Sequence, residues 1–182
     1  SCEVGGVAGQ PIASRAIWTI ATSRAYIHHN HVHHSNMHAL DFDAYTSNSV
    51  AWGNLCEDNR DEGIFVEETA TDNVIAANVC RRNQNGIGVY SNVVGPVKNN
   101  VFFGNVVEDN TKYGITAGGL GHDATKYSQG NVFFGNSAAG NQGDAAFNAM
   151  HGAVQENYWF GNGHGTVSFQ GHSQASANVS IF

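Results

Sequence analysis

Asparagine recurs along this chain at intervals close to the length of one supersecondary unit. Six asparagines each follow a short apolar run, and successive members stand 24, 24, 27, 31 and 26 residues apart. The six are Asn30, Asn54, Asn78, Asn105, Asn136 and Asn162. Repeats of this length are typical of solenoids such as the parallel β-helix, whose coils stack on one another. Because an asparagine tolerates bends and stacked amides hydrogen-bond to one another, we expect a structural asparagine ladder.

The residues between the asparagines predict three short strands in each coil, separated by turns. An apolar run precedes the first asparagine of a coil, and a later strand opens with glycine and a β-branched residue. Side chains alternate along a strand, so Ile64, Ile87 and Ile115 are expected to stack inside. No stretch of useful length has the period of a helix. We therefore expect an all-β chain folded as a single parallel β-helix of about six coils.

Length and composition fit one stacked β domain. The chain has 182 residues, of which 22 are glycine and only 13% are charged, against about 25% in an average soluble domain. The net charge of -7 argues against binding to nucleic acid or to an anionic membrane surface. No apolar run approaches the roughly 20 residues needed for membrane insertion. We expect coils over residues 25–162, a degenerate first coil or cap at 1–24, and a terminal coil or cap at 163–182.

Two of the three cysteines are separated by one coil. Cys56 and Cys80 stand 24 residues apart, so they should be neighbours in adjacent coils. Neighbouring strands lie about 4.8 Å apart, within the Cα range of a disulfide. The pair is therefore either a disulfide or, as we favour, two stacked small apolar residues.

Aromatic residues occupy adjacent positions in successive coils, so one aromatic row must face outward. We expect the inward row to be Ile75, Phe102, Phe133 and Trp159. We expect the outward row to be Trp52, Phe103, Phe134 and Phe160. An exposed row of this kind is covered by a loop, used in a homo-oligomer or filament, or used to stack on sugar rings.

Acidic residues cluster in two consecutive coils. The 24-residue offset places Asp43 beside Glu67, and alternation with inward apolar residues makes Asp41, Asp43 and Glu67 project outward. Stacked carboxylates repel one another unless a cation, a raised pKa or a basic neighbour compensates. Asp43, Glu67 and Glu68 are therefore candidate calcium ligands, and a solvated acidic face is the alternative.

Histidines cluster just before the acidic residues. Six of the ten lie between residues 28 and 38. Alternate histidines on a strand share a face, and imidazole is a common zinc or copper ligand. The expected bend at Asn30 spreads this cluster over two sides of the coil. His38 stands three residues before Asp41, and we expect it to be exposed on the acidic strand as a proton-transfer group.

The coil pattern over about residues 25–161 resembles the right-handed β-helix proteins of the pectin-lyase-like superfamily. Within it, residues 38–43, followed one coil later by 61–67, resemble the catalytic stretch of secreted mannuronan (alginate) epimerases. That stretch reads Tyr-Gly-Phe-Asp-Pro-His in the family and His-Ala-Leu-Asp-Phe-Asp here. Asp41 matches the family's aspartate, whereas His38 and Asp43 stand at its catalytic tyrosine and histidine. The resemblance implies a right-handed β-helix in an extracellular, polysaccharide-processing protein.

Lyase or epimerase chemistry on a uronic-acid polymer needs a base beside the sugar carboxylate and a cation or donor to stabilise the resulting anion. The candidate catalytic residues are His38, Asp41 and Asp43. The candidate substrate-binding residues are Glu67, Tyr90 and Lys112. Calcium is the expected cofactor, because it would help an acidic protein accept an acidic polysaccharide. The competing hypothesis is a non-catalytic structural or adhesive β-helix that assembles through its aromatic row or its end coils.

Overall fold

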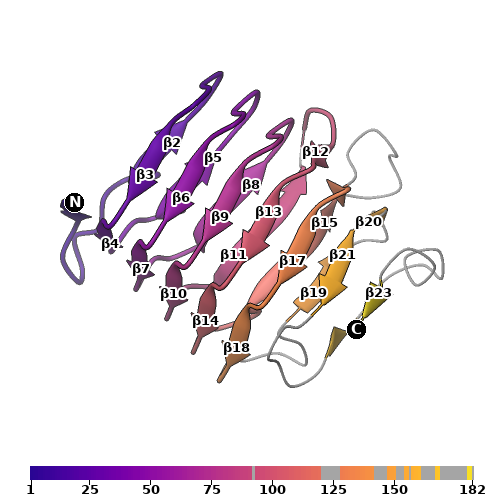
Figure 1. Cartoon of the computed structure of the whole chain (residues 1–182). Helices are drawn as coiled ribbons and strands as arrows, with labels where there is room; N and C mark the ends of the chain where they lie inside the picture. The colour runs from indigo at the N-terminus through magenta and orange to yellow at the C-terminus, as the bar shows by residue number, and fades with distance from the viewer. Residues whose placement is uncertain are drawn as a thin grey trace.

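The chain folds as a solenoid in which each coil adds one strand to each of three parallel sheets (Figure 1). The computed structural model describes residues 1–91, 93–119, 128–141, 147–150, 154–155, 157–160, 167–168 and 180–181. Over these residues every ordered element is a strand, and none is a helix that could cross a membrane. The all-β, parallel β-helix prediction is confirmed.

Sheet I runs along one side of the solenoid. Its strands are β1 (Glu3–Gly5), β4 (His31–His33), β7 (Leu55–Glu57), β10 (Val79–Arg81), β14 (Val106–Glu108) and β18 (Ser137–Ala139). All neighbours pair in parallel, and the register places Cys56 beside Cys80. Both cysteines are fully buried free thiols, so their predicted adjacency is confirmed and they pack as small apolar residues.

Sheet II has the longest strands. They are β2 (Ile17–Thr19), β5 (Leu40–Phe42), β8 (Glu62–Glu67), β11 (Asn85–Ser91), β15 (Ile115–Gly119), β19 (Phe147–Met150) and β22 (Val167–Ser168). Ile64, Ile87 and Ile115 are partners in successive strands and are fully buried, as predicted. Segment 1–24 supplies β1 and β2, which continue sheets I and II by one coil.

Sheet III carries the aromatic rows. Its strands are β3 (Tyr26–His28), β6 (Val50–Trp52), β9 (Val74–Ala76), β13 (Val101–Phe103), β17 (Val132–Phe134), β21 (Tyr158–Phe160) and β23 (Ser180–Ile181). A short fourth sheet joins β12 (Val97–Lys98), β16 (Ser128–Gln129) and β20 (Val154–Gln155).

The inward aromatic row fills the core, as predicted. Ile75, Phe102 and Phe133 have no exposed surface, and the two phenylalanine rings stack with centroids 4.6 Å apart. A buried side chain of this size contributes roughly 1.5–3 kcal/mol to folding. The side chains of Trp159 and Phe160, which were predicted for the inner and outer rows, lie outside the described residues.

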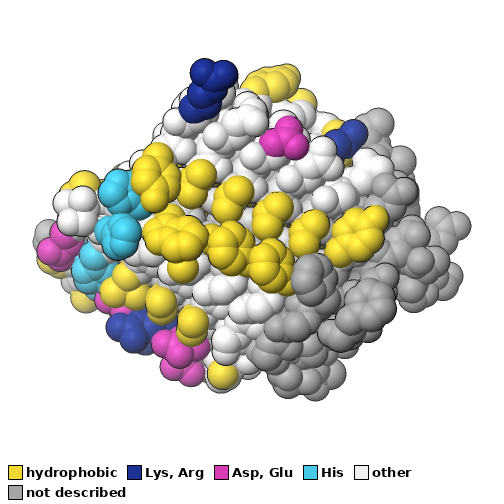
Figure 2. Space-filling view, in the orientation of Figure 1, with side chains coloured by type: hydrophobic (Ala, Val, Ile, Leu, Met, Phe, Trp, Pro, Cys, Tyr) yellow, Lys and Arg dark blue, Asp and Glu magenta, His cyan; other side chains and the backbone are white. Residues whose placement is uncertain are grey.

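The outward row is also confirmed. Trp52 is 36% exposed, and it contacts Phe103, which stacks on Phe134 with centroids 5.2 Å apart. Figure 2 shows apolar side chains crossing this face in rows, with histidines at one end. Tyr26 and Tyr158, which belong to the neighbouring outward row on the same sheet, are 60% and 46% exposed.

Asparagine ladders tie the coils together at the bends. The backbone N–H and side-chain amide of Asn54 both donate to Oδ1 of Asn78, at 2.9 and 3.0 Å, and Asn78 repeats this toward Asn105. The left-handed residue is the one before the asparagine, such as Ala77 at φ 52°, rather than the asparagine itself. Two further ladders bond in the same way, one through Asn59 and one through Asn73, and the latter was not predicted from the sequence.

Candidate acid–base site on sheet II

The outward side of sheet II carries ionisable groups on β5, β8 and β11, and Arg15 and His38 stand just before β2 and β5. Leu40 and Phe42 are fully buried in the core, so Asp41 between them points away from it. Asp41 stands opposite Trp18 of β2 and Phe65 of β8. The predicted direction of the acidic residues is therefore right, but these groups are covered rather than exposed.

Arg15 stands at the centre of the cluster. Its Nε donates to Asp41 Oδ2, and its Nη2 lies 3.3 Å from Glu67 Oε1. The guanidinium also lies over the ring of Trp18, whose Nε1 donates to Asp43 at 2.9 Å. Arg15 keeps 23% of its side chain exposed, whereas that of Asp41 is wholly buried. Solvent therefore reaches the arginine before it reaches the carboxylates.

His38 belongs to the same cluster and is buried, with only 4% of its surface exposed. The expectation of an exposed histidine is therefore wrong, because the alternation of strand residues gives direction but not what lies over them. One side-chain atom each of His38, Asp41 and Glu67 lies within 4.8 Å of the other two. This grouping brings together two catalytic candidates, His38 and Asp41, and one substrate-binding candidate, Glu67, from two different coils.

A second carboxylate holds His38 from the next coil. Glu62 Oε2 lies 2.8 Å from His38 Nδ1, an ion-pair distance without hydrogen-bond alignment. Glu62 Oε1 accepts from Tyr90 Oη at 2.7 Å and from Asn85 Nδ2 at 3.0 Å. Glu62 is 1% exposed, so this network is shielded from solvent.

A glycine makes room for the network. A Cβ at Gly88 would lie 2.9 Å from Glu62 Cγ and 3.1 Å from the Phe65 ring, closer than real side chains pack. The Phe65 ring fills the middle of the site, with its centroid 4.6 Å from that of His38 and 4.5 Å from that of Tyr90. Glycine at this position of β11 therefore lets three side chains meet over one strand.

Burial and neighbouring charges shift the acids in opposite directions. Burial, reinforced by Asp41 and Asp43, raises the pKa of Glu67 to about 9. Burial also raises the pKa of Asp41 to about 6, although His38 and Arg15 oppose the shift. At neutral pH Glu67 is therefore a neutral acid beside an ionised aspartate.

The His38–Glu62 pair behaves as an ion pair. Burial alone would raise the pKa of Glu62, but contact with His38 outweighs it and lowers the pKa to about 2. Burial lowers the pKa of His38, whereas Glu62 raises it by more, so the net shift is upward. The site thus holds proton donors, a proton acceptor and a fixed cation within one cluster. These are the groups that general acid–base catalysis requires.

Two buried carboxylate oxygens of the cluster, Asp41 Oδ1 and Glu62 Oε2, have no hydrogen-bond donor among the described residues. The other oxygen of Asp41, Oδ2, is bonded to Arg15. An unpaired buried carboxylate oxygen costs free energy unless another group supplies a proton or a charge. Because Glu62 Oε2 already pairs with His38 Nδ1, Asp41 Oδ1 is the one of the two oxygens that is open to a proton.

Two of the predicted residues lie apart from this group. The carboxylate of Glu68 accepts from Ser91 Oγ and from the backbone N–H groups of Val93 and Val94, so it caps that turn. Lys112 Nζ donates to a glutamine side chain at 3.0 Å in an exposed setting. Over the described residues, Asp43, Glu67 and Glu68 do not gather into a set of close metal ligands.

Arg15 and Glu62 were not among the site residues predicted from the sequence. Glu62 stands one coil period of 24 residues after His38, which was the available signal. Arg15 is in register with His38 because Ala16 N–H donates to the His38 carbonyl at 3.1 Å. Arg15 stands 23 residues before His38, in a segment that has no ladder asparagine. The repeat therefore could not be aligned there from the sequence.

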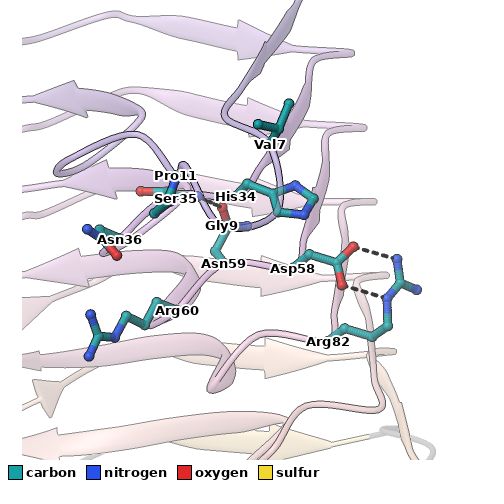
Figure 3. A pocket seen from close by; sticks show the side chains of 10 residues that line it. All are labelled: Val7, Gly9, Pro11, His34, Ser35, Asn36, Asp58, Asn59, Arg60 and Arg82. Atoms are coloured by element: carbon teal, nitrogen blue, oxygen red, sulfur yellow. Dashed lines mark hydrogen bonds and ion pairs between the residues drawn. The ribbon is translucent and has the colours of Figure 1, made fainter.

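A separate hollow of about 420 Å³ lies at another corner of the first coils (Figure 3). Its lining is Val7, Gly9, Pro11, His34, Ser35, Asn36, Asp58, Asn59, Arg60 and Arg82. Arg82 closes one side by bonding to Asp58 at 2.8 and 2.9 Å. None of the acid–base residues lines this hollow, so the two features are distinct.

Comparison with known proteins identifies the fold. A family described as "Right handed beta helix region" matches residues 2–127. No curated protein sequence matches the chain. A double mutant of the periplasmic alginate epimerase AlgG matches with a TM-score of 0.68 and 17% identity, over 92% of this chain and 48% of that one. The Agl-KA catalytic domain matches with a TM-score of 0.65 and 16% identity, over 87% and 30%.

These likenesses concern the fold. At such low identity, shared architecture does not carry an activity. The chain spans about half the length of the first structure and less than a third of the second. The resemblance to pectin-lyase-like β-helices is confirmed at the level of the fold.

Proposed function

The chain belongs to the right-handed β-helix family, and we propose that the acid–base cluster on sheet II processes a polysaccharide by lyase or epimerase chemistry on uronic-acid units. The observation that carries the proposal is the meeting of Arg15, Asp41 and Glu67 from three consecutive coils. It joins a cation, an ionised carboxylate and a neutral carboxylic acid, which are the groups that this chemistry requires. The epimerase activity in the name of one structural neighbour supports this choice.

In this proposal Arg15 receives the polymer. It is more accessible than either of its acidic partners, and its guanidinium already contacts the carboxyl groups of Asp41 and Glu67. A uronate carboxylate can replace Asp41 as the partner of that guanidinium, because Arg binds carboxylates in a fixed fork geometry. The exchange releases Asp41 Oδ2 and brings the sugar above the cluster.

Asp41 then accepts the proton from the carbon next to the uronate carboxylate. The C–H electron pair passes into the carboxylate, and Arg15 stabilises the charge that develops there. In epimerisation, His38 or Glu67 donates a proton to the opposite face of the same carbon. In a lyase, the electron pair instead expels the oxygen of the neighbouring glycosidic bond, which takes the donated proton. Tyr90 and Glu62 hold His38 for either route.

Mixed assays on uronate polymers test this function. Wild-type protein is incubated with polymannuronate, polyguluronate and polygalacturonate. Lyase products are followed by the ultraviolet absorbance of unsaturated uronates, and epimerisation by the NMR signals of the sugar units. Asp41→Asn should reduce turnover by about 10²- to 10⁴-fold. Asp58→Asn, which changes an aspartate at another corner of the coil, should keep full turnover. Full activity of Asp41→Asn, or no conversion of any uronate polymer by the wild type, would refute the proposal.

Calcium stays a prediction for this site. Asp43, Glu67 and Glu68 are the ligands expected from the sequence. Glu68 bonds to a neighbouring turn, and Arg15 already supplies a positive charge beside Glu67. We propose that calcium acts mainly by bridging the acidic protein to an acidic polymer. Running the same assays with calcium and with a chelator tests this. We further propose an extracellular location, in line with the periplasmic origin of one structural neighbour.

A second candidate function is structural. We propose that the apolar side of sheet III mediates self-association, because Trp52, Phe103 and Phe134 form a continuous outward row on a parallel sheet. Light scattering on the wild type and on Phe103→Ser/Phe134→Ser tests this reading. If both proteins are monomeric, the self-association proposal fails. If the wild type is an oligomer and the double variant is a monomer, the proposal is supported.

A further inference from the structure

A second cluster of ionisable side chains lies on sheet I, away from the acid–base site. It joins Glu3 of β1 with His31 and His33 of β4. One ligand atom of each residue lies within 4.8 Å of the other two. Glu3 is exposed and the histidines are half-buried, so the cluster is open to solvent.

The register of two strands builds this cluster. β1 pairs in parallel with β4, with Glu3 opposite His31 and Gly5 opposite His33. Val32 is fully buried, so the histidines on either side of it point outward together, with ring centroids 4.5 Å apart. The expected bend at Asn30 therefore separates these histidines from His28 but leaves them on one short strand.

Gly5 is needed for the position of the His33 ring. A Cβ at Gly5 would lie 2.6 Å from His33 Nδ1 and closer still to other ring atoms. The ring therefore lies flat across the glycine and extends toward β1. Its Nε2 reaches Glu3 Oε1 at 3.0 Å.

Each histidine also contacts a side chain outside the cluster, and this contact fixes its ring. His31 Nε2 lies 2.8 Å from Glu57 Oε1, and that carboxylate accepts from both Arg81 and Arg82 at 2.7 Å. His33 Nδ1 lies 2.8 Å from His34 Nδ1, so one of the two nitrogens carries the shared proton. Metal-binding histidines characteristically have such partners on the nitrogen that does not bind the metal.

We propose that Glu3, His31 and His33 bind a divalent transition-metal ion of the zinc class. Two imidazoles and a carboxylate suit zinc and exclude a preference for calcium or magnesium, which favour oxygen ligands. Three protein ligands leave a coordination position for water or for an external group. Because the ligands come from β1 and β4, a bound ion clamps the first coil onto the second.

Zinc titration of the chelator-treated protein tests the proposal. Isothermal calorimetry with zinc chloride should show a site that His33→Ala and His31→Ala each abolish. His34→Gly keeps the left-handed turn, at φ 53°, and removes the neighbouring imidazole. It should weaken zinc binding by about 10- to 100-fold.

Two further variants separate ligand geometry from histidine content. Gly5→Ala retains all three ligands but displaces the His33 ring, and it should also lose the zinc site. The control is His28→Ala/His29→Gly, because that pair has a similar Nδ1–Nδ1 contact of 2.9 Å without a carboxylate of β1. It should bind zinc as the wild type does. Zinc should raise the thermal midpoint of the wild type and of the control, but not of His33→Ala.

The result that would overturn the proposal is equally specific. Unchanged zinc affinity in His33→Ala and Gly5→Ala, or loss of the site in the His28/His29 control alone, places the metal elsewhere. A wild-type protein that binds no zinc also overturns the proposal. Circular dichroism of each variant before titration shows whether it is folded.

Discussion

Glu67 should make the fold less stable as the pH rises, and glutamine at this position should remove the effect. Its pKa moves from 4.5 to about 9 on folding, chiefly because the carboxyl group is buried and faces Asp41 and Asp43. A carboxyl group with a raised folded-state pKa is favourable below its unfolded pKa, and its contribution is lost as the pH rises to the folded value. Glutamine is neutral throughout, so Glu67→Gln should be increasingly more stable than the wild type from about pH 4.5 to about pH 9.

The size of this effect follows from the same pKa values. Each pKa unit corresponds to about 1.4 kcal/mol, so the stability difference between variant and wild type should grow by about 4 kcal/mol between about pH 5 and about pH 8. Urea unfolding of both proteins at these two pH values measures it. Glu108→Gln, which makes the same substitution on sheet I outside the cluster, is the matched control. Equal differences at both pH values would mean that Glu67 ionises normally, and the neutral-acid role would fail.

Three further predictions concern the solenoid itself. Ala77→Gly should add about 1 kcal/mol of stability by urea unfolding, because Ala77 has a φ of 52° where Gly104 stands one coil later. Asn78→Ala should cost roughly 2–4 kcal/mol in the same assay, because it removes buried ladder bonds and leaves their partners unpaired. A thiol titration under denaturing, non-reducing conditions should find Cys56 and Cys80 free, and loss of two thiols would contradict the unbonded pair.

The repeat made the fold predictable because asparagines at equivalent bends make the same hydrogen bonds in successive coils. Asn54, Asn78 and Asn105 could be aligned from their apolar flanks alone, and their hydrogen bonds follow. The ladder through Asn73 and Asn100 was missed, because these asparagines stand before an apolar run, whereas the predicted ladder was aligned on asparagines that follow one. A search keyed to one side of the apolar run finds only the bends on that side.

The site was only partly predictable, for a different reason. Strand alternation gives the direction of Asp41 and the coil period gives its neighbour Glu67, and both follow from spacing. The cover over Asp41 comes from Arg15 in the first coil, where no asparagine marks the register, and His38 packs against Phe65 and Glu62 of the next coil. Spacing also cannot show that Glu68 turns to cap a backbone turn. Side-chain cover and local caps are set by packing, which a periodic pattern does not encode.

The outward faces of sheets II and III differ in polarity, and the fold does not require this difference. On sheet III, Val50 and Val74 are paired outward neighbours beside the aromatic row, and this side is apolar. On sheet II, the corresponding layer buries Asp41, Glu62 and Glu67 with their charged partners. Buried ion pairs contribute little net stability, and apolar replacements of similar volume are often neutral or stabilising. The asparagine ladders and the aliphatic core already hold these coils together, so the cluster on sheet II is explained better by chemistry than by folding.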